Sequence, residues 1–309
     1  MRPAVYIPNF NGALRLGAAL RSLQEQSRPL DIVVVDNGSS DGSAELVRER
    51  FPEVDLQELG ANLGFGPALN RAIAAHPADP VILFNNDAVA APRFVEALLD
   101  VHTTGAEAVA GILTQERAPE LIDSAGVVAD RTLLGFDYLH GEPLAAATGA
   151  APPLGPTGGA ALYARAAFDA VGGFDERIFL YYEDLDLALR MAATGARCRL
   201  APEATAVHAY SASLGAGSGA KYERTGWSRG YMLRRYGVMR SPRSAARVLA
   251  IEGATCAGQL LLDRTGAGAR GRRQGWHEGA GLERRTVAGA PLLELTLREA
   301  LALRRRRRG

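Results

Sequence analysis

Short apolar runs alternate with helically patterned segments along the first part of the chain. The runs at residues 4–8, 31–36 and 81–84 are apolar and rich in β-branched residues, as is typical of buried strands. Between them, segments 13–26 and 43–50 repeat apolar residues every three or four positions, which predicts helices. This alternation indicates an α/β fold, with a mixed, mainly parallel sheet flanked by helices on both faces.

The pattern continues less regularly to about residue 208. Further helices are predicted over 67–75, 93–103, 165–171 and 184–193, and further strands over 55–58, 108–113, 160–164 and 204–208. The last of these strands is expected at an edge of the sheet. Residues 114–156 hold clusters of Gly, Pro and Ala without clear periodicity and predict no more than a hairpin.

The character of the sequence changes after about residue 220. We predict a main domain over 1–220 and a basic, mainly helical C-terminal extension over 221–309. An amphipathic helix near 243–263 is expected either to pack on the main domain or to lie on a membrane.

Charge is distributed unevenly between these two units. The extension holds 20 Lys and Arg against 7 Asp and Glu, a net charge of +13 in a chain whose total is +1, so residues 1–220 carry −12. It finishes in five consecutive arginines, Arg304 to Arg308. Such a segment suits an anionic membrane surface or anionic ligands, and a solvated, frayed tail is the alternative for the last five residues. We expect no nucleic-acid partner.

The cysteines and the hydropathy of the chain indicate where in the cell the protein is expected. Cys198 and Cys256 have no CxxC partner and form no disulfide framework, which favours a reducing, cytoplasmic compartment. No run reaches the roughly 18 apolar residues of a membrane span. The nearest candidate, 248–262, is interrupted by Glu252. We therefore expect a cytoplasmic protein, with peripheral contact at the inner face of the cell membrane as a further expectation.

The first motif with chemical content is VVVDNGSSDGS at 33–43, where a strand ends in Asp36. In open α/β sheets, ligands bind outside the carboxyl ends of the strands. Asp36 is placed to accept a hydrogen bond from the N3–H of a pyrimidine base. Capping of the turn and the next helix is the alternative for this segment, and it is the role we assign to Ser39, Ser40 and Asp41.

The second motif is ANLGFGPALNRAI at 61–73, a glycine-containing loop that leads into a helix. Free backbone N–H groups at such a helix start can bind an anion. The segment is neither GxGxxG nor a P-loop, so the dinucleotide and ATP interpretations lose their main support. Asn62, Gly64 and Asn70 are its candidate substrate-binding residues. The alternative is that the two asparagines satisfy loop carbonyls.

The third motif is VILFNNDAVA at 81–90, where a buried strand delivers Asn85, Asn86 and Asp87 to its carboxyl end. One carboxylate with amides and water can place Mg²⁺ or Mn²⁺ against a substrate diphosphate, because the phosphates supply the other ligands. An Asn-rich turn that caps the helix near Pro92 is the alternative.

The fourth motif is GGFDERIFLYYEDLDLALR at 172–190, with a helix expected to begin at Glu183 or Asp184. A helix N-terminus stabilises an ionised carboxylate, which can take a proton from an acceptor hydroxyl. Asp186 and Arg190 are four residues apart, as in a surface ion pair. His208, at the end of a later strand, is a candidate metal ligand or a structural hydrogen-bonding residue.

Together these motifs resemble the inverting glycosyltransferases of family 2, which have the GT-A fold, and most closely their bacterial rhamnosyltransferase-like branch. The segments that carry the resemblance appear in the family's order over residues 4–213: YIPNFNG, DNGSSDGS, NLGFGPALN, LFNNDA, GPTGGAALYAR, GGFDERIFLYYEDLDLALR and VH. The resemblance implies a Rossmann-like GT-A domain, followed here by the C-terminal helical extension.

The resemblance also assigns roles residue by residue. It implies that Asp36 contacts the base, that Asp87 and His208 bind the metal, that Asp184 is the catalytic base, that Pro8 and Asn9 border the nucleotide, and that Gly158 and Gly159 border the donor sugar. Asn86 and Glu183 complete the expected substrate-binding set. The first aspartate of the family's DxD motif is Asn85 here, which puts strict metal dependence in doubt. No QxxRW motif is present, which favours transfer of a single sugar.

The expected activity is a metal-dependent, inverting transfer of one sugar, with rhamnose the first choice. The expected donor is a dTDP- or UDP-sugar, the cofactor Mn²⁺ or Mg²⁺, and the acceptor a hydroxyl on a cell-envelope or lipid-linked glycan. Two alternatives stand beside it. One is a hydrolase or nucleotidyltransferase on a similar sheet, against which the ED helix argues. The other is a catalytically degenerate partner protein, against which the presence of both Asp87 and Asp184 argues.

Overall fold

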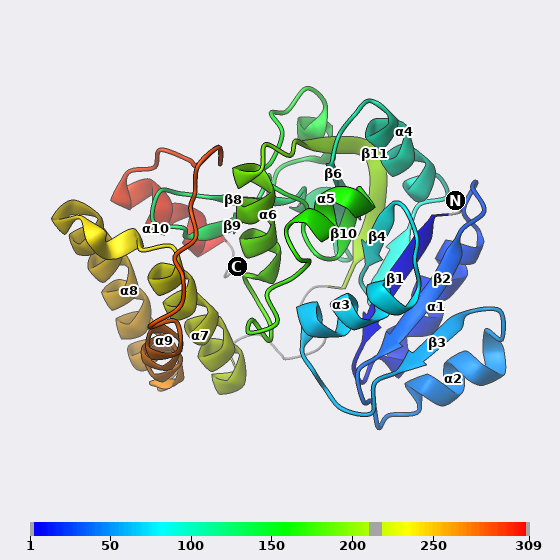
Figure 1. The fold of residues 1–309 in the computed structure, drawn as a ribbon, viewed down its shortest axis with the longest axis horizontal. Coiled ribbons are helices and arrows are strands. Elements are labelled where there is room, and N and C mark those ends of the chain that lie inside the picture. Colours follow the sequence, from blue (N-terminus) through cyan, green and yellow to red (C-terminus); the bar gives the residue numbers. More distant parts are fainter. Residues whose placement is uncertain (1–2, 210–217, 307–309) are drawn as a thin grey trace.

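A nine-stranded sheet forms the centre of the molecule in a computed structural model, which describes residues 3–209 and 218–306 (Figure 1). Its strand order is β3-β2-β1-β4-β10-β6-β11-β5, with β7 paired to β6. The strands are β1 (Ala4–Asn9), β2 (Asp31–Asp36), β3 (Asp55–Glu58), β4 (Val81–Phe84), β5 (Ala88–Ala90), β6 (Ala108–Gln115), β7 (Ala118–Ser124), β10 (Ala160–Tyr163) and β11 (Cys198–His208).

The sheet is mixed and mainly parallel, as predicted. Strands β1 to β4 pair in parallel, and β11 pairs in parallel with β6. Strand β10 is antiparallel to both β4 and β6, and β5 is antiparallel to β11. One prediction is wrong: the strand at 204–208 does not lie at an edge. It is the second half of β11, which has eleven residues and lies between β6 and β5.

Helices cover both faces of the sheet because each strand alternates apolar side chains between two cores. The helices α1 (Ala13–Gln24), α2 (Ser43–Arg50) and α4 (Phe94–Thr103) pack with Val5, Val34 and Ile82 on one face. The helices α3 (Phe65–Ala75), α5 (Arg165–Ala170) and α6 (Glu183–Ala193) pack with Tyr6 and Leu83 on the other.

The segment without clear periodicity contains the predicted hairpin. Strands β8 (Val127–Ala129) and β9 (Gly135–Asp137) pair antiparallel in a small sheet of their own, and a short 3₁₀ helix, η1 (Leu144–Ala147), follows. Val127 and Ala129 pack against α6, while Val128 and Phe136 pack toward the C-terminal helices. The hairpin therefore joins the sheet region to the C-terminal region.

The C-terminal helices gather on one side of the molecule, beyond β8 and β9 (Figure 1). They are α7 (Gly219–Arg235), α8 (Pro242–Leu262), α9 (Ala267–Glu278) and α10 (Leu297–Arg306), with the 3₁₀ helix η2 (Val238–Arg240) before α8. Helices α7 and α9 approach to backbone contact: a Cβ on Gly230 would lie 2.0 Å from the Arg272 carbonyl oxygen, and one on Gly275 would lie 1.9 Å from that of Trp227. Only glycine permits this approach.

The C-terminal helices share a core with α6, in which Leu185 and Leu189 pack with Tyr231 and Met232 of α7. The unit boundary near residue 220 stays a prediction, and so does the role of the arginine run. Residues 307–309 and the side chains of Arg304 to Arg306 lie outside what the structure describes.

Buried charges strengthen this junction. The Asp186 side chain is fully buried and accepts hydrogen bonds from Arg190 at 2.8 Å, Tyr236 at 2.8 Å and Arg285 at 2.6 Å. Arg285 also lies 2.7 Å from Asp175, in the loop before α6. The predicted Asp186–Arg190 pair is confirmed, but it is buried and belongs to a larger network, not to the surface.

Helix α8 covers the apolar segment that Glu252 interrupts. Among the described residues it is the one helix that length and composition would allow to cross a membrane. Only 22% of its most apolar stretch is buried, so α8 is not a core helix.

Candidate active site

The carboxyl ends of three neighbouring parallel strands bring the first group of predicted residues together. The pairing of β1 with β2 sets Asn9 opposite Asp36. The Asn9 amide donates to Asp36 Oδ1 at 3.1 Å and accepts from Asn86 Nδ2 at 2.8 Å, so one side chain links the ends of β1, β2 and β4. Pro8 is the residue before Asn9 on β1 and pairs with Val35. The structure thus places Asn9, Asp36 and Asn86 in one cluster.

The loop before α3 is held beside this cluster by a residue that sequence reasoning missed. Asn37 is buried, donates to Asn62 Oδ1 at 3.1 Å and to the Gly64 carbonyl at 2.9 Å, and accepts from Leu63 N at 2.8 Å. Asn62 in turn accepts from Gly64 N at 3.0 Å. Asn37 belongs to the DNGSSDGS motif, in which a ligand contact was predicted for the neighbouring Asp36 and none for Asn37.

Asp87 and His208 meet at the predicted metal position, although 121 positions separate them in the chain. Their Oδ1 and Nε2 atoms are 3.2 Å apart, because β11 ends where it pairs with β5, directly after Asp87. The Asn85 amide lies 3.1 Å from the same Nε2. On the other side of the ring, Nδ1 lies 2.7 Å from Asp123 Oδ2. Asp123 was not among the predicted site residues.

The environment of His208 is dominated by carboxylates. Burial opposes protonation of the ring, but the hydrogen bonds that the ring donates to the Asp123 and Asp87 carboxylates outweigh burial and raise the pKa of His208 to about 9. In proteins, a metal-binding histidine usually donates its other ring N–H to a carboxylate, which fixes the tautomer. The bond to Asp123 has this form, with Nε2 directed at Asp87.

The donor set fits a hard divalent cation that shares its coordination with a substrate. Neighbouring ligands of an octahedral Mg²⁺ at 2.0–2.1 Å lie about 3 Å from each other, close to the separation of Asp87 Oδ1 and His208 Nε2. The described residues contain no group of three or more His, Cys, Asp or Glu arranged to hold a metal ion. Two protein ligands therefore suffice only if a substrate, such as a diphosphate, supplies others.

The two acidic residues of the fourth motif differ in burial. Glu183 and Asp184 begin α6, after Tyr181 and Tyr182, whose φ angles of 68° and 69° lie in the left-handed region. Residues held this way cost about 1–3 kcal/mol each and cluster at functional sites. Glu183 is buried with no hydrogen bond to Oε2, and burial, then the Asp184 charge, raises its pKa. Asp184 is half-buried and accepts from Leu185 N at 2.7 Å.

Close backbone contacts connect the α6 loop with the strand ends. Phe65 N donates to the Phe179 carbonyl at 2.8 Å, and a Cβ on Gly64, whose φ is +95°, would lie 2.4 Å from that same oxygen. The loop that carries the ED pair therefore crosses the start of α3.

The two predicted glycines on the donor-sugar side lie in close contact with neighbouring side chains. A Cβ on Gly158 would lie 2.8 Å from the Phe65 ring, and one on Gly159 would lie 2.6 Å from the Asn85 amide. Asn70 binds the backbone of Phe174 through both of its amide atoms, at 2.9 Å each. Its observed role is thus to anchor the loop before α6, and its contact with substrate stays a prediction.

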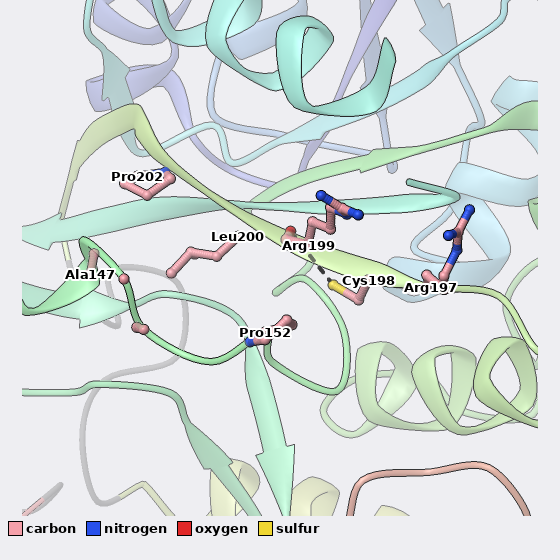
Figure 2. A pocket seen from close by; sticks show the side chains of 9 residues that line it. Ala147, Pro152, Arg197, Cys198, Arg199, Leu200 and Pro202 are labelled. Atoms are coloured by element: carbon pink, nitrogen blue, oxygen red, sulfur yellow. Dashed lines mark hydrogen bonds between the residues drawn. The ribbon is translucent and has the colours of Figure 1, made fainter. Parts of the chain in front are cut away.

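One surface cavity touches the predicted site, and a second, larger cavity does not. A cavity of about 310 Å³ opens beside Asp87 and Arg15. A larger one, about 450 Å³, is lined by the start of β11 and residues 147–152, with Arg197, Cys198 and Arg199 at its wall (Figure 2). This cavity lies at the amino-terminal end of β11, whereas His208 is at the carboxyl-terminal end. No predicted site residue lines it.

Comparison with known proteins identifies the family. Residues 4–172 match the family described as Glycosyl transferase family 2. Over 237 residues, the chain is 33% identical to N-acetylglucosaminyl-diphospho-decaprenol L-rhamnosyltransferase of Mycobacterium tuberculosis, covering 69% of this chain and 75% of that protein.

Solved structures give the fold. Mannosyltransferase PcManGT from Pyrobaculum calidifontis, in complex with GDP-Man and Mn²⁺, superposes with a TM-score of 0.55 at 21% identity over 88% of this chain and 73% of that one. GalNAc-T7 with UDP, GalNAc and Mn²⁺ gives 0.63 at 13% identity over 89% and 54%. The fold is therefore the GT-A fold that the sequence motifs implied. The chain belongs to glycosyl transferase family 2, and it is a glycosyltransferase.

Proposed function

We propose that this glycosyltransferase moves one sugar from a dTDP- or UDP-sugar to a hydroxyl of a lipid-linked or cell-envelope glycan, with inversion at the anomeric carbon. Rhamnose is the first choice of sugar, because the relative from M. tuberculosis is named as an L-rhamnosyltransferase. That name also specifies GlcNAc on diphospho-decaprenol, so a polyprenyl diphosphate-linked GlcNAc is the proposed acceptor class. The protein would act in the cytoplasm, with its basic extension against the inner face of the membrane.

This proposal rests mainly on the contact between Asp87 and His208, which lies at the same edge of the sheet as Asp36. Asp36 and Asn9 would border the nucleotide, and Asp87 and His208 would hold a divalent cation against its diphosphate. Such a cation neutralises the charge that builds on the leaving diphosphate. The 61–66 loop adds no free N–H group at Leu63, Gly64 or Phe65, because these donate to Asn37, Asn62 and Phe179.

Asp184 is the better candidate for the catalytic base. A base must be ionised at neutral pH, and burial raises the pKa of Glu183 above its ordinary value. Asp184 is half-buried at the positive end of α6, which favours its ionised form. It would take the proton of the acceptor hydroxyl as the oxygen attacks the anomeric carbon and the bond to the diphosphate breaks. The unpartnered Oε2 of Glu183 would bind a substrate hydroxyl.

The decisive experiment measures release of nucleotide diphosphate from a panel of dTDP- and UDP-sugars, with Mn²⁺ or Mg²⁺ and polyprenyl diphosphate-linked GlcNAc. We expect transfer from one donor, with inverted configuration in the product, and loss of transfer with a chelator and in Asp184→Asn. Transfer that persists with chelator would overturn the metal requirement alone. Donor binding without transfer to any lipid-linked acceptor would overturn the acceptor class. No binding of any nucleotide-sugar would favour a catalytically degenerate partner protein.

A further inference from the structure

The outer face of α8 reverses the usual polarity of a surface helix. From residue 246 to residue 261, its exposed positions follow helical spacing along one side and carry only apolar residues: Ala246, Leu249, Ala250, Gly253, Ala254, Ala257, Leu260 and Leu261. Leu249, Leu260 and Leu261 are 63%, 60% and 77% exposed, and the next residue, Leu262, is 74% exposed. A helix on the surface of a soluble protein normally places charged and polar residues on this side. A contiguous apolar face of this kind marks a site of interaction.

Three polar side chains in the second half of α8 point inward instead. Glu252, Thr255 and Gln259 are all buried. Glu252 is bound by Arg229 of α7, at 2.8 Å, and by Arg272 of α9, at 2.5 Å. Glu252 thus anchors α8 to the two helices behind it and leaves the leucine face outward. In Figure 1, α8 lies at the rim of the molecule farthest from the central sheet.

This anchoring decides between lying on a membrane and crossing one. A crossing α8 would carry Glu252 into hydrocarbon and strip it from Arg229, which is itself almost completely buried. Burial of an unpaired charge is strongly unfavourable. The fold therefore keeps α8 parallel to any bilayer that it touches.

We propose that the leucine face of α8 inserts shallowly into the surface of a bilayer that contains anionic lipids. Exposed arginines lie near both ends of this face: Arg243 is in the first turn of α8, and Arg264 follows Asp263, the residue after Leu262. Two more exposed arginines, Arg270 and Arg273, lie on α9, the next helix. An apolar helix face flanked by arginines is the pattern of interfacial binding, in which leucines enter the acyl boundary and cations meet anionic headgroups. The contact differs from the arginine run at 304–308, because it depends on apolar burial as well as on charge.

The test compares vesicle binding by the full-length protein and two variants, in flotation assays with phosphatidylcholine vesicles with and without phosphatidylglycerol. Leu249→Gln/Leu260→Gln/Leu261→Gln removes the apolar face, and we expect vesicle partitioning to fall about tenfold or more. Ala254→Asp keeps the leucines and places a carboxylate in the middle of the face, and it should also weaken binding. Leu14→Gln, at a 93% exposed leucine on α1, is the matched control and should bind as the wild type does.

Circular dichroism and the thermal midpoint confirm that each variant folds, since every changed side chain is exposed. Residual binding by the wild type at high salt, lost in the triple variant, supports the proposal, because salt screens charge and not apolar burial. Binding that salt abolishes and the triple variant retains would overturn it in favour of arginine contacts alone. A wild type that ignores vesicles but forms a dimer that the triple variant loses would overturn it in favour of a protein partner. Vesicle binding is measured without donor or acceptor, so failure here leaves the proposed activity untouched.

Discussion

The sheet region and the C-terminal helices bury opposite kinds of side chain. In the sheet region, apolar residues fill two cores, and the polar residues Asn9, Asp36 and Asp87 collect at one strand edge. In the C-terminal helices, Arg229 and Glu252 are buried and leucines of α8 are exposed. The first arrangement builds a site for small polar ligands, whereas the second holds helices together through ions and leaves an apolar surface. We therefore expect substitutions of charged residues to lower activity in the sheet region and stability in the C-terminal helices.

The largest expected effect is on activity, from Asp184→Asn. Loss of the base should lower kcat about 10³-fold, within the usual range for general base catalysis, while KM for the donor stays nearly constant. Steady-state kinetics at saturating Mn²⁺ measures both constants. Glu176→Gln, an exposed carboxylate of the same loop, is the control and should keep wild-type activity. If Glu183→Gln lowered kcat by this factor and Asp184→Asn stayed active, Glu183 would be the base instead.

A stability effect follows in the contact between α7 and α9. Gly275→Val places side-chain atoms against the Trp227 carbonyl, where a Cβ alone would be 1.9 Å away, so the helices must separate. We expect the free energy of unfolding to fall by about 3 kcal/mol or more. Gly253→Ala is the matched control, because its Cβ would meet open space and alanine favours the helix by about 1 kcal/mol. Urea unfolding curves measure both, and similar midpoints in the two variants would refute the close contact.

The buried ions also predict a pH dependence of stability. Burial acts to raise the pKa of Glu252, but Arg229 and Arg272 outweigh burial and lower it from 4.5 to about 2. A depressed pKa stabilises the fold above pH 4.5, and that stabilisation is lost as pH falls from 4.5 toward 2. The Glu252 contribution to this loss is about 3 kcal/mol.

Unfolding experiments at a series of pH values check this prediction. In Glu252→Gln the stability at pH 7 should be lower and the decline below pH 4.5 shallower than in the wild type. Glu283→Gln, at an exposed position, should retain the wild-type pH profile. A profile of Glu252→Gln parallel to that of the wild type would remove Glu252 from the ion network.

The smallest effect concerns Asp123, which positions the His208 ring through Nδ1. Asp123→Asn should weaken Mn²⁺ binding 10- to 100-fold, as loss of such a partner typically does. Activity should recover when Mn²⁺ is raised, which a general loss of structure would not allow. Calorimetric Mn²⁺ titration in the presence of nucleotide diphosphate measures the affinity, with Asp169→Asn on the surface of α5 as the control. Unchanged affinity with reduced kcat would assign Asp123 a different role.

The sheet region was largely predictable because its signals are local. The apolar strands at 4–8, 31–36 and 81–84 end in polar residues, and the parallel order of their ends follows from the helices between them. Asp36 and Asp87 could therefore be placed near each other from sequence. Asp123 could not, because its partner is 85 positions away and its own segment has no clear periodicity.

The C-terminal helices themselves were predicted, but the side of α8 that faces inward was not, because a charged residue lies on that side. A hydrophobic pattern identifies the helix near 243–263, but it assigns the apolar side to the interior, and the structure places Glu252 there. The position of β11 in the sheet was mispredicted for a related reason. Burial alternates only partly along this strand, and its location between β6 and β5 depends on pairings distant in sequence. The direction in which a helix faces depends here on long-range ion pairs, which composition does not reveal.

The junction at Asp186 has a consequence for how this enzyme can be recombined with its relatives. Arg285, far along the chain, binds Asp175 and Asp186 on either side of the ED pair. A chimera joined between α6 and α7 would inherit the two aspartates from one parent and their arginine from the other. Such a chimera keeps this network only if the first parent carries the two aspartates and the second carries the arginine.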